Sequence, residues 1–190
     1  MKFRNILLVT FLFINILAQA QNRYKVDKEQ SQLSITGTST LHDWEIEVNE
    51  YHGYIDILES KKGLEINGGK LSIEVESFKS GKGGMDKKVY EAMEYEDHPL
   101  IYFEYKNTIK QTTEDRDLNM IINGDLTIAG VTRNIEVEIN GTFSSEKTLQ
   151  FEGVKGFKMT TFNIEPPSAM FGTIKSGDKI TVDYSIIFQH

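Results

Sequence analysis

The sequence predicts an all-β protein built from antiparallel strands. Apolar and polar residues alternate with a period of two in five separate runs, at 43–48, 71–76, 101–106, 134–139 and 180–189. Successive side chains of a strand point to opposite faces of a sheet, so each run predicts one buried face and one solvated face. Buried parallel strands read instead as continuous apolar runs, and therefore the alternation favours antiparallel pairing.

Residues with turn chemistry separate or interrupt these runs. Asn67-Gly68-Gly69 and Ala129-Gly130 tolerate positive φ angles. Asn123-Gly124 and Asn140-Gly141 lie inside alternating runs, where glycine more often marks a bulge or a bend. Bends let a sheet curl, but about eight strands of this kind form either a sandwich or a barrel. The periodicity does not choose between the two.

One segment has a helical pattern instead. Met85, Val89 and Met93 recur at a spacing of four, and Pro99 follows. This pattern predicts one short helix at about 84–95 between two strands.

The first twenty residues have the composition of a secretory targeting segment. Lys2 and Arg4 are basic, residues 6–17 are almost all apolar, and Ala18-Gln19-Ala20 has the small-x-small pattern of a cleavage site. A membrane span needs roughly 20 apolar residues, so the run is too short for one. We therefore expect a signal peptide at 1–20, no integral membrane span after its cleavage, and a periplasmic or secreted location.

The remainder, 21–190, is expected to be a single domain. Loss of Lys2 and Arg4 lowers the basic count from 21 to 19 against 28 acidic residues, which gives a net charge of −9. Such a surface repels nucleic acid. The chain has no cysteine, which excludes thiolate zinc sites, iron–sulfur clusters and cysteine nucleophiles.

Histidine and acidic residues give no recognisable catalytic or metal motif. His42 precedes Asp43 and His98 follows Asp97, but neither pair has the HExxH spacing of a zinc protease. The sequence thus predicts no catalytic residue, no metal site and no cofactor. The alternative is an exported enzyme for a hydrophobic substrate, with His42 and Asp43 as its acid–base pair.

Bulky and flexible apolar residues are the remaining candidates for a site. They form either an ordinary packed core or the wall of a cavity, which methionine can line because its side chain adapts. These candidates are Trp44, Phe78, Met85, Tyr90, Met93, Phe103, Met120, Phe157, Met159, Phe162, Met170 and Phe171.

Three stretches together resemble the YceI-like family of exported barrels. They are the opening at 24–48, the helix-to-strand segment at 85–107, and GDLTIAGVTRNIEVEI at 124–139, which the closing strand at 178–188 follows. The resemblance implies an extended, lipocalin-like antiparallel barrel of about eight strands, with the short helix near its mouth. In its later part the sequence departs from the family pattern. FKMTTFNIEPPSAMFG occupies the place where the family usually has an Arg-x-Asp-Phe-Gly stretch.

The resemblance also implies a ligand, namely a polyisoprenoid, an isoprenoid quinone or a fatty acid or amide held inside the barrel. We therefore expect a carrier of a long-chain isoprenoid or acyl lipid and not an enzyme. A third hypothesis is a barrel whose interior is filled by its own side chains and which acts as an interaction module. The sequence is also compatible with a homodimer.

The expected ligand-binding residues follow from the resemblance and from the apolar set. Helix residues form a gate or wall, later aromatic and methionine residues line the lumen, and Trp44 belongs to a His-Asp-Trp motif without an assigned role. The full set is Trp44, Phe78, Met85, Val89, Tyr90, Met93, Phe103, Phe157, Met159, Phe162 and Phe171.

Overall fold

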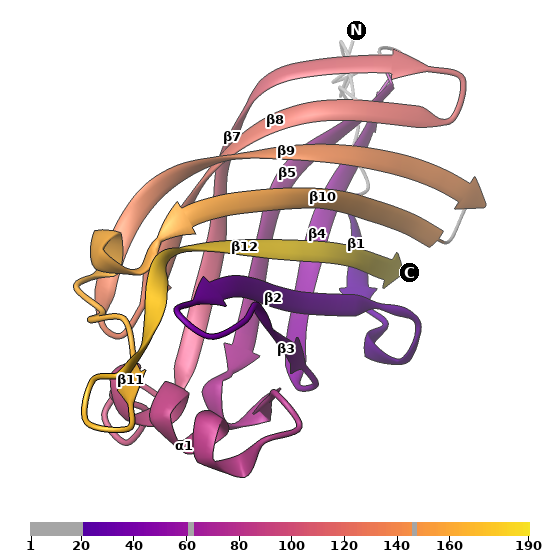
Figure 1. Cartoon of the computed structure of the whole chain (residues 1–190). Coiled ribbons are helices and arrows are strands. Elements are labelled where there is room, and N and C mark those ends of the chain that lie inside the picture. Colours follow the sequence, from indigo (N-terminus) through magenta and orange to yellow (C-terminus); the bar gives the residue numbers. More distant parts are fainter. Residues whose placement is uncertain (1–20, 61–62, 146–147) are drawn as a thin grey trace, which may run out of the picture.

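The computed structural model describes residues 21–60, 63–145 and 148–190, and these residues form a closed antiparallel barrel (Figure 1). The expected signal peptide lies outside the described residues. The eight strands of the ring, in spatial order, are β1 (Gln21–Val26), β4 (Tyr51–Ser60), β5 (Gly63–Glu74), β7 (Leu100–Glu114), β8 (Asp117–Ile128), β9 (Val131–Ser145), β10 (Thr148–Lys158) and β12 (Ile174–Gln189).

Closure of the ring depends on the two ends of the chain. Lys25 pairs with Gln189 and Val26 pairs with Phe188, which joins β1 to β12. This pairing makes the sheet a barrel and not a sandwich. The predicted fold class is confirmed.

Short elements extend the barrel at one end. β1 ends just before η1 (Lys28–Gln30). After η1 the chain continues as β2 (Gln32–Ser39), which pairs with β12 and with β3 (Trp44–Val48) and not with β4. β3 also pairs with β6 (Phe78–Lys79). The remaining short elements are η2 (Val75–Ser77), η3 (Met159–Phe162) and β11 (Ser168–Ala169).

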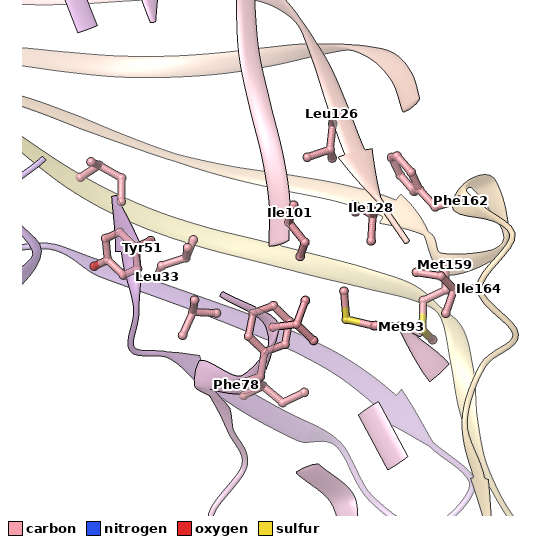
Figure 2. Close-up of a cluster of buried hydrophobic side chains, with 14 residues drawn as sticks. Leu33, Tyr51, Phe78, Met93, Ile101, Leu126, Ile128, Met159, Phe162 and Ile164 are labelled. Carbon is pink, nitrogen blue, oxygen red and sulfur yellow. The ribbon is translucent and has the colours of Figure 1, made fainter. Parts of the chain in front are cut away.

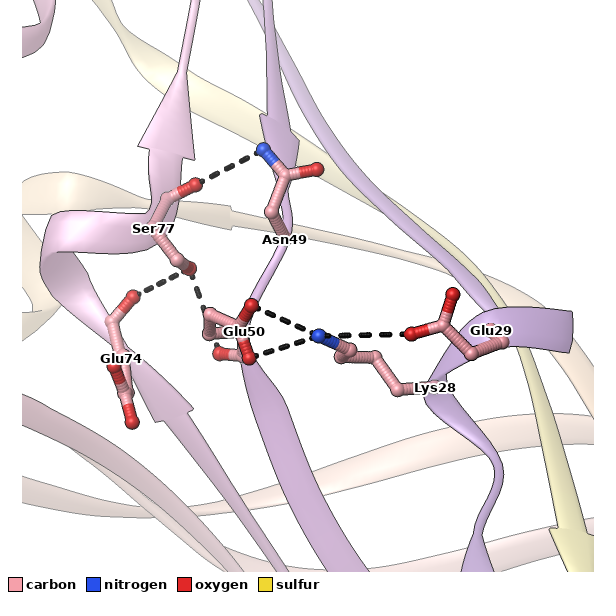
Figure 3. A network of polar contacts seen from close by, with 6 residues as sticks. All are labelled: Lys28, Glu29, Asn49, Glu50, Glu74 and Ser77. Atoms are coloured by element: carbon pink, nitrogen blue, oxygen red, sulfur yellow. Dashed lines mark hydrogen bonds and ion pairs between the residues drawn. The ribbon is translucent and has the colours of Figure 1, made fainter.

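A polar network joins the places where these strands break (Figure 3). The Lys28 Nζ atom in η1 lies 2.8 and 2.9 Å from the carboxylate oxygens of Glu50, which sits between β3 and β4. The Ser77 hydroxyl donates to the backbone oxygen of Glu74 at 2.7 Å and lies 3.4 Å from that of Glu50. The Asn49 side-chain amide donates to the Ser77 backbone oxygen. The network thus ties η1 and η2 to the β3–β4 junction.

Helix α1 (Gly83–Ala92) lies at the extended end of the barrel (Figure 1). It begins and ends slightly earlier than the 84–95 that the spacing predicts. The difference at its end has a local cause, since Glu94 adopts a left-handed φ of 51° and its carbonyl accepts the His98 amide at 2.8 Å. None of the helices in the described residues is long and apolar enough to cross a bilayer.

The glycine-containing segments behave differently from one another. Ala129 and Gly130, with φ angles of 46° and 72°, form the two-residue turn between β8 and β9. By contrast, Asn67 is a bulge inside β5, because Gly68 pairs with Asp56 while Ile66 pairs with Ile57.

Apolar side chains gather in two clusters at opposite ends of the barrel. The first cluster lies beside α1 and includes Leu33, Phe78, Met93, Met159 and Phe162 (Figure 2). The second cluster forms what we term the floor, and its members come from the far ends of the strands. The floor residues are Tyr24, Ile55, Ile57, Leu118, Met120, Ile122, Ile139, Leu149 and Phe151.

A candidate ligand-binding cavity inside the barrel

A cavity of about 500 Å³ occupies the barrel between the two clusters. Its volume lies within the ~300–1,000 Å³ that is typical of small-molecule sites. The wall draws on every ring strand except β1, on β2 and β3, and on α1. Its apolar residues on β12, for example, are Ile174, Ile180, Val182, Tyr184, Ile186 and Phe188.

The burial of inward-facing residues shows that the barrel is hollow. Ile35, Leu71, Ile135 and Val182 point inward and line the cavity, yet each is only half-buried. In a filled core such aliphatic side chains are packed on all sides. Their remaining exposed surface therefore faces the cavity.

The cavity is closed by the floor at one end and reaches the surface at the other. Floor residues Ile55, Ile122, Ile139 and Phe151 form its deepest wall, and each is buried. At the α1 end the wall includes exposed residues from the β2–β3 loop, from the helix and from β11. The mouth residues of this kind are Leu41, His42, Lys82, Gly84, Lys88, Ser168 and Ala169.

His42 lies at this mouth but does not form an acid–base pair with the Asp43 carboxylate. Its Nδ1 atom donates to the backbone oxygen of Asp43 at 2.6 Å, and its Nε2 atom lies 3.5 Å from the Lys82 Nζ atom. The imidazole is thus held by a backbone carbonyl and faces a cation. His98 packs elsewhere, with its ring against Gly130.

Most of the sequence-predicted site residues lie on the cavity wall. Those on the wall are Trp44, Phe78, Met85, Val89, Met93, Phe103, Phe157 and Met159. They come from β3, β6, α1, β7, β10 and η3, apart from Met93, which caps the C-terminal end of α1. Met85, Val89 and Met93 recur every four residues, so α1 and its cap present one apolar face to the cavity.

Three predicted site residues do not reach the wall. The Tyr90 hydroxyl lies between α1 and β6, 2.8 Å from the Phe78 oxygen and 2.9 Å from the Glu76 oxygen, and the Lys79 ammonium donates to it at 2.7 Å. Phe162 is fully buried behind the wall, with its ring edge-on to Phe157 at 5.3 Å.

Phe171 points into solvent instead of into the barrel. Met170, Phe171 and Gly172 all adopt positive φ angles in the tight turn between β11 and β12, which directs the first two side chains outward. The large side chain of Phe171 suggested an inward position, but the backbone angles of the turn direct it into solvent.

The sequence reasoning missed the aliphatic part of the wall. Ile35, Ile135, Val137 and Val182 line the cavity beside the aromatic residues. Their inward position follows from the same period-two alternation that identifies the strands, so the signal was present.

Tyr184 is the most strongly perturbed ionisable group on the wall. Burial, and then the nearby charges of Glu138 and Asp183, raise the pKa of its phenol above the usual value. The hydroxyl donates to the Glu138 backbone oxygen at 2.7 Å. Tyr184 is on β12 and Glu138 is on β9, so the side chain reaches across β10.

A closed antiparallel barrel with an apolar cavity that opens at one end defines the lipocalin-like class of protein. Within that class, the sequence profile of the YceI-like domain matches residues 24–188. The chain therefore belongs to the YceI-like family, as its motifs predict. No curated protein sequence matches it significantly.

Solved structures share the fold at low sequence identity. A Saccharophagus degradans polyisoprenoid binding domain implicated in plant cell wall breakdown superposes with a TM-score of 0.69 at 14% identity, covering 87% of this chain and 97% of that one. Burkholderia cenocepacia BcnA gives 0.68 at 18% identity, with coverage of 85% and 98%. The Campylobacter jejuni YCEI protein gives 0.60 at 16%, with coverage of 75% and 82%.

Proposed function

We propose that this protein is an exported carrier that holds a long-chain amphipathic lipid in its barrel. The observation that carries the proposal is a cavity of about 500 Å³ with an apolar wall, a closed floor and one mouth, whose side residues are only half-buried. An apolar chain that enters the cavity covers this wall, and the polar end of the molecule remains at the mouth.

The energetics favour a long ligand. Each buried methylene contributes about 0.8 kcal/mol, whereas association costs roughly 4–15 kcal/mol. Offsetting that cost with apolar contacts alone takes about five to twenty methylenes, so a chain of about twenty carbons exceeds it over the whole range. The Saccharophagus neighbour, described as a polyisoprenoid binding domain, supports an isoprenoid chain, and an isoprenoid quinone or a fatty acid or amide has the same character.

Export is supported by the composition of the first twenty residues. Their basic start, apolar run and Ala18-Gln19-Ala20 end are the features that signal peptidase reads. Mass spectrometry of the protein from its own host should then give a chain that begins at Gln21. A chain that retains Met1 in the envelope fraction would contradict cleavage at this site.

Native mass spectrometry tests the carrier function on the same sample. We expect an adduct that organic extraction releases and identifies as a polyprenyl or acyl compound. The stripped protein should take up a long-chain quinone or fatty amide again. Bare protein that takes up neither after stripping would refute the proposal.

A further inference from the structure

Large aromatic rings line the cavity, yet its centre is empty. Trp44, Phe103 and Tyr184 all face inward. A ring that stands upright from a barrel wall fills much of a narrow lumen, since a small barrel is just wide enough for its side chains to fill it. Some feature of the wall must therefore hold these rings flat.

That feature is a glycine on the adjacent strand. Trp44 is paired directly with Gly37, and Tyr184 is paired directly with Gly153. Phe103 lies diagonally across from Gly124, which pairs with Tyr105. Each glycine occupies an inward-facing position, so its missing side chain leaves a shallow depression in the wall.

The rings occupy these depressions. A Cβ atom placed on Gly37, Gly124 or Gly153 would overlap the indole of Trp44, the ring of Phe103 or the hydroxyl of Tyr184, respectively. Two rings are also held at their polar ends, because the Trp44 Nε1 atom donates to the Thr38 oxygen at 2.9 Å and the Tyr184 hydroxyl donates to the Glu138 oxygen.

The same arrangement recurs at the floor. Phe151 pairs directly with Gly141, where an added Cβ atom would lie 3.1 Å from the ring. Phe151 also meets Phe188 edge-on at 5.5 Å. Aromatic rings on cross-strand glycines thus occur at the mouth, along the wall and at the floor.

We infer that Gly37, Gly124 and Gly153 determine how wide a chain the cavity accepts, because they let the rings of Trp44, Phe103 and Tyr184 lie flat. An alanine at Gly37 meets the Trp44 ring, whereas at Gly124 and Gly153 the new methyl group also meets the backbone oxygens of Glu104 at 2.9 Å and Glu138 at 2.6 Å. In each case the methyl group displaces the opposing ring, which tilts into the lumen and narrows it. A narrower lumen excludes a methyl-branched, isoprenoid-like chain before it excludes a linear acyl chain. This inference rests on the proposed lipid-carrier function and assigns the residues that set its selectivity.

Two fatty acids isolate the effect of chain width. Hexadecanoic acid and phytanic acid share a carboxylate and a sixteen-carbon backbone, and only phytanic acid carries methyl branches. Trp44 is the single tryptophan of the chain and lies on the cavity wall, so its fluorescence reports binding directly.

The variants Gly124→Ala and Gly153→Ala leave Trp44 and its glycine unchanged. Gly156→Ala is the matched control, because Gly156 lies on the same strand as Gly153 but faces outward, where a Cβ atom would have ordinary contacts at 3.6 Å. All proteins are used as the stripped mature chain, and thermal unfolding verifies that each variant is folded.

The unaltered protein and Gly156→Ala should bind both acids. Gly124→Ala and Gly153→Ala should bind phytanic acid about tenfold more weakly and hexadecanoic acid within about threefold of the unaltered protein. Equal weakening of both acids, or no weakening, overturns the inference while the carrier function stands. If the unaltered protein binds neither acid, the carrier function fails and the inference fails with it.

Two further variants keep the test decisive if an alanine variant does not fold. Phe103→Ala removes a ring and should raise the affinity for phytanic acid relative to hexadecanoic acid. In the double variant Gly124→Ala/Phe103→Leu the smaller side chain makes room for the new methyl group, so phytanic acid binding should return. An unchanged ratio of the two affinities in Phe103→Ala contradicts the inference.

Discussion

At the scale of single residues, Tyr184 lines the cavity and forms a hydrogen bond with the backbone of the barrel wall. Its hydroxyl donates to the Glu138 backbone oxygen, and its ring crosses Gly153. Because a typical intramolecular hydrogen bond contributes about 0.5–1.5 kcal/mol, Tyr184→Phe should lower the free energy of unfolding by about that amount. Urea unfolding measures it, with Tyr102→Phe as a control on the outward face of β7, where no effect is expected.

The same residue predicts a loss of stability in alkali. The pKa of Tyr184 is raised above its ordinary value by burial, so the folded state favours the neutral phenol. Its contribution is complete below the unfolded-state value near pH 10 and is lost as pH rises above that value. Tyr184→Phe should therefore flatten the alkaline decline in the free energy of unfolding, and an equally steep decline in the variant would contradict this assignment.

At the scale of elements, an ion pair between Lys28 and Glu50 links η1 to the β3–β4 junction (Figure 3). The hydrogen bond from Lys28 holds the pKa of Glu50 below its usual range. A carboxylate with a lowered pKa stabilises the fold above its unfolded-state value near pH 4.5, and this contribution is lost as pH falls through the folded-state value.

Glu50→Gln should therefore be less stable than the unaltered protein at neutral pH, and the two should converge at acid pH. The effect should be small and should weaken in high salt, because both side chains remain partly exposed to solvent. Thermal unfolding at several pH values measures it. A difference that stays constant down to pH 2 would show that the ion pair is not its source.

Helix α1 is attached to the barrel by the Tyr90 hydroxyl, which the sequence interpretation placed on the cavity wall instead. If α1 moves aside for ligand exchange, the hydrogen bond that the Tyr90 hydroxyl donates to the backbone oxygens of Phe78 in β6 and Glu76 in η2, shared between the two, holds it closed. Removing such a bond costs about 0.5–1.5 kcal/mol, so Tyr90→Phe should release ligand about two- to tenfold faster. Stopped-flow displacement measures the rate, and an unchanged rate would show that exchange does not require α1 to move.

Sequence reasoning predicted the strands and the helix because their signals are local. The alternation of Ile180, Val182 and Tyr184 reports which face is buried, and this needs no partner strand. Closure of the barrel instead depends on the pairing of Val26 with Phe188, residues from opposite ends of the chain. Periodicity carries no information about such a pairing, and only the family resemblance favoured a barrel.

The candidate site, like the fold, was predictable only in part from the sequence. Bulky residues such as Trp44 and Phe157 were identified, since large inward side chains form any wall. Phe171 was misplaced because its direction is set by backbone angles in a turn. The pairing of rings with Gly37, Gly124 and Gly153 depends on strand register, so a lone glycine in the sequence reads equally well as a bend.

At the scale of the whole molecule, the decisive property is that the barrel is hollow. Val182 faces inward at mid-barrel and is half-buried, whereas Val154 on the neighbouring strand faces outward and is 58% exposed. Replacement of each by phenylalanine adds the same volume on opposite sides of the wall. Comparing the two variants therefore tests whether the interior of the barrel is empty or packed.

Val182→Phe should abolish binding of a long-chain lipid and leave the free energy of unfolding nearly unchanged, because the ring enters empty space. In a packed interior the same substitution would cost about 1–3 kcal/mol through strain. Val154→Phe should affect neither property. Lipid titration and urea unfolding of both variants give the answer, and a strongly destabilised Val182→Phe that still binds lipid would show that the ligand lies outside the barrel.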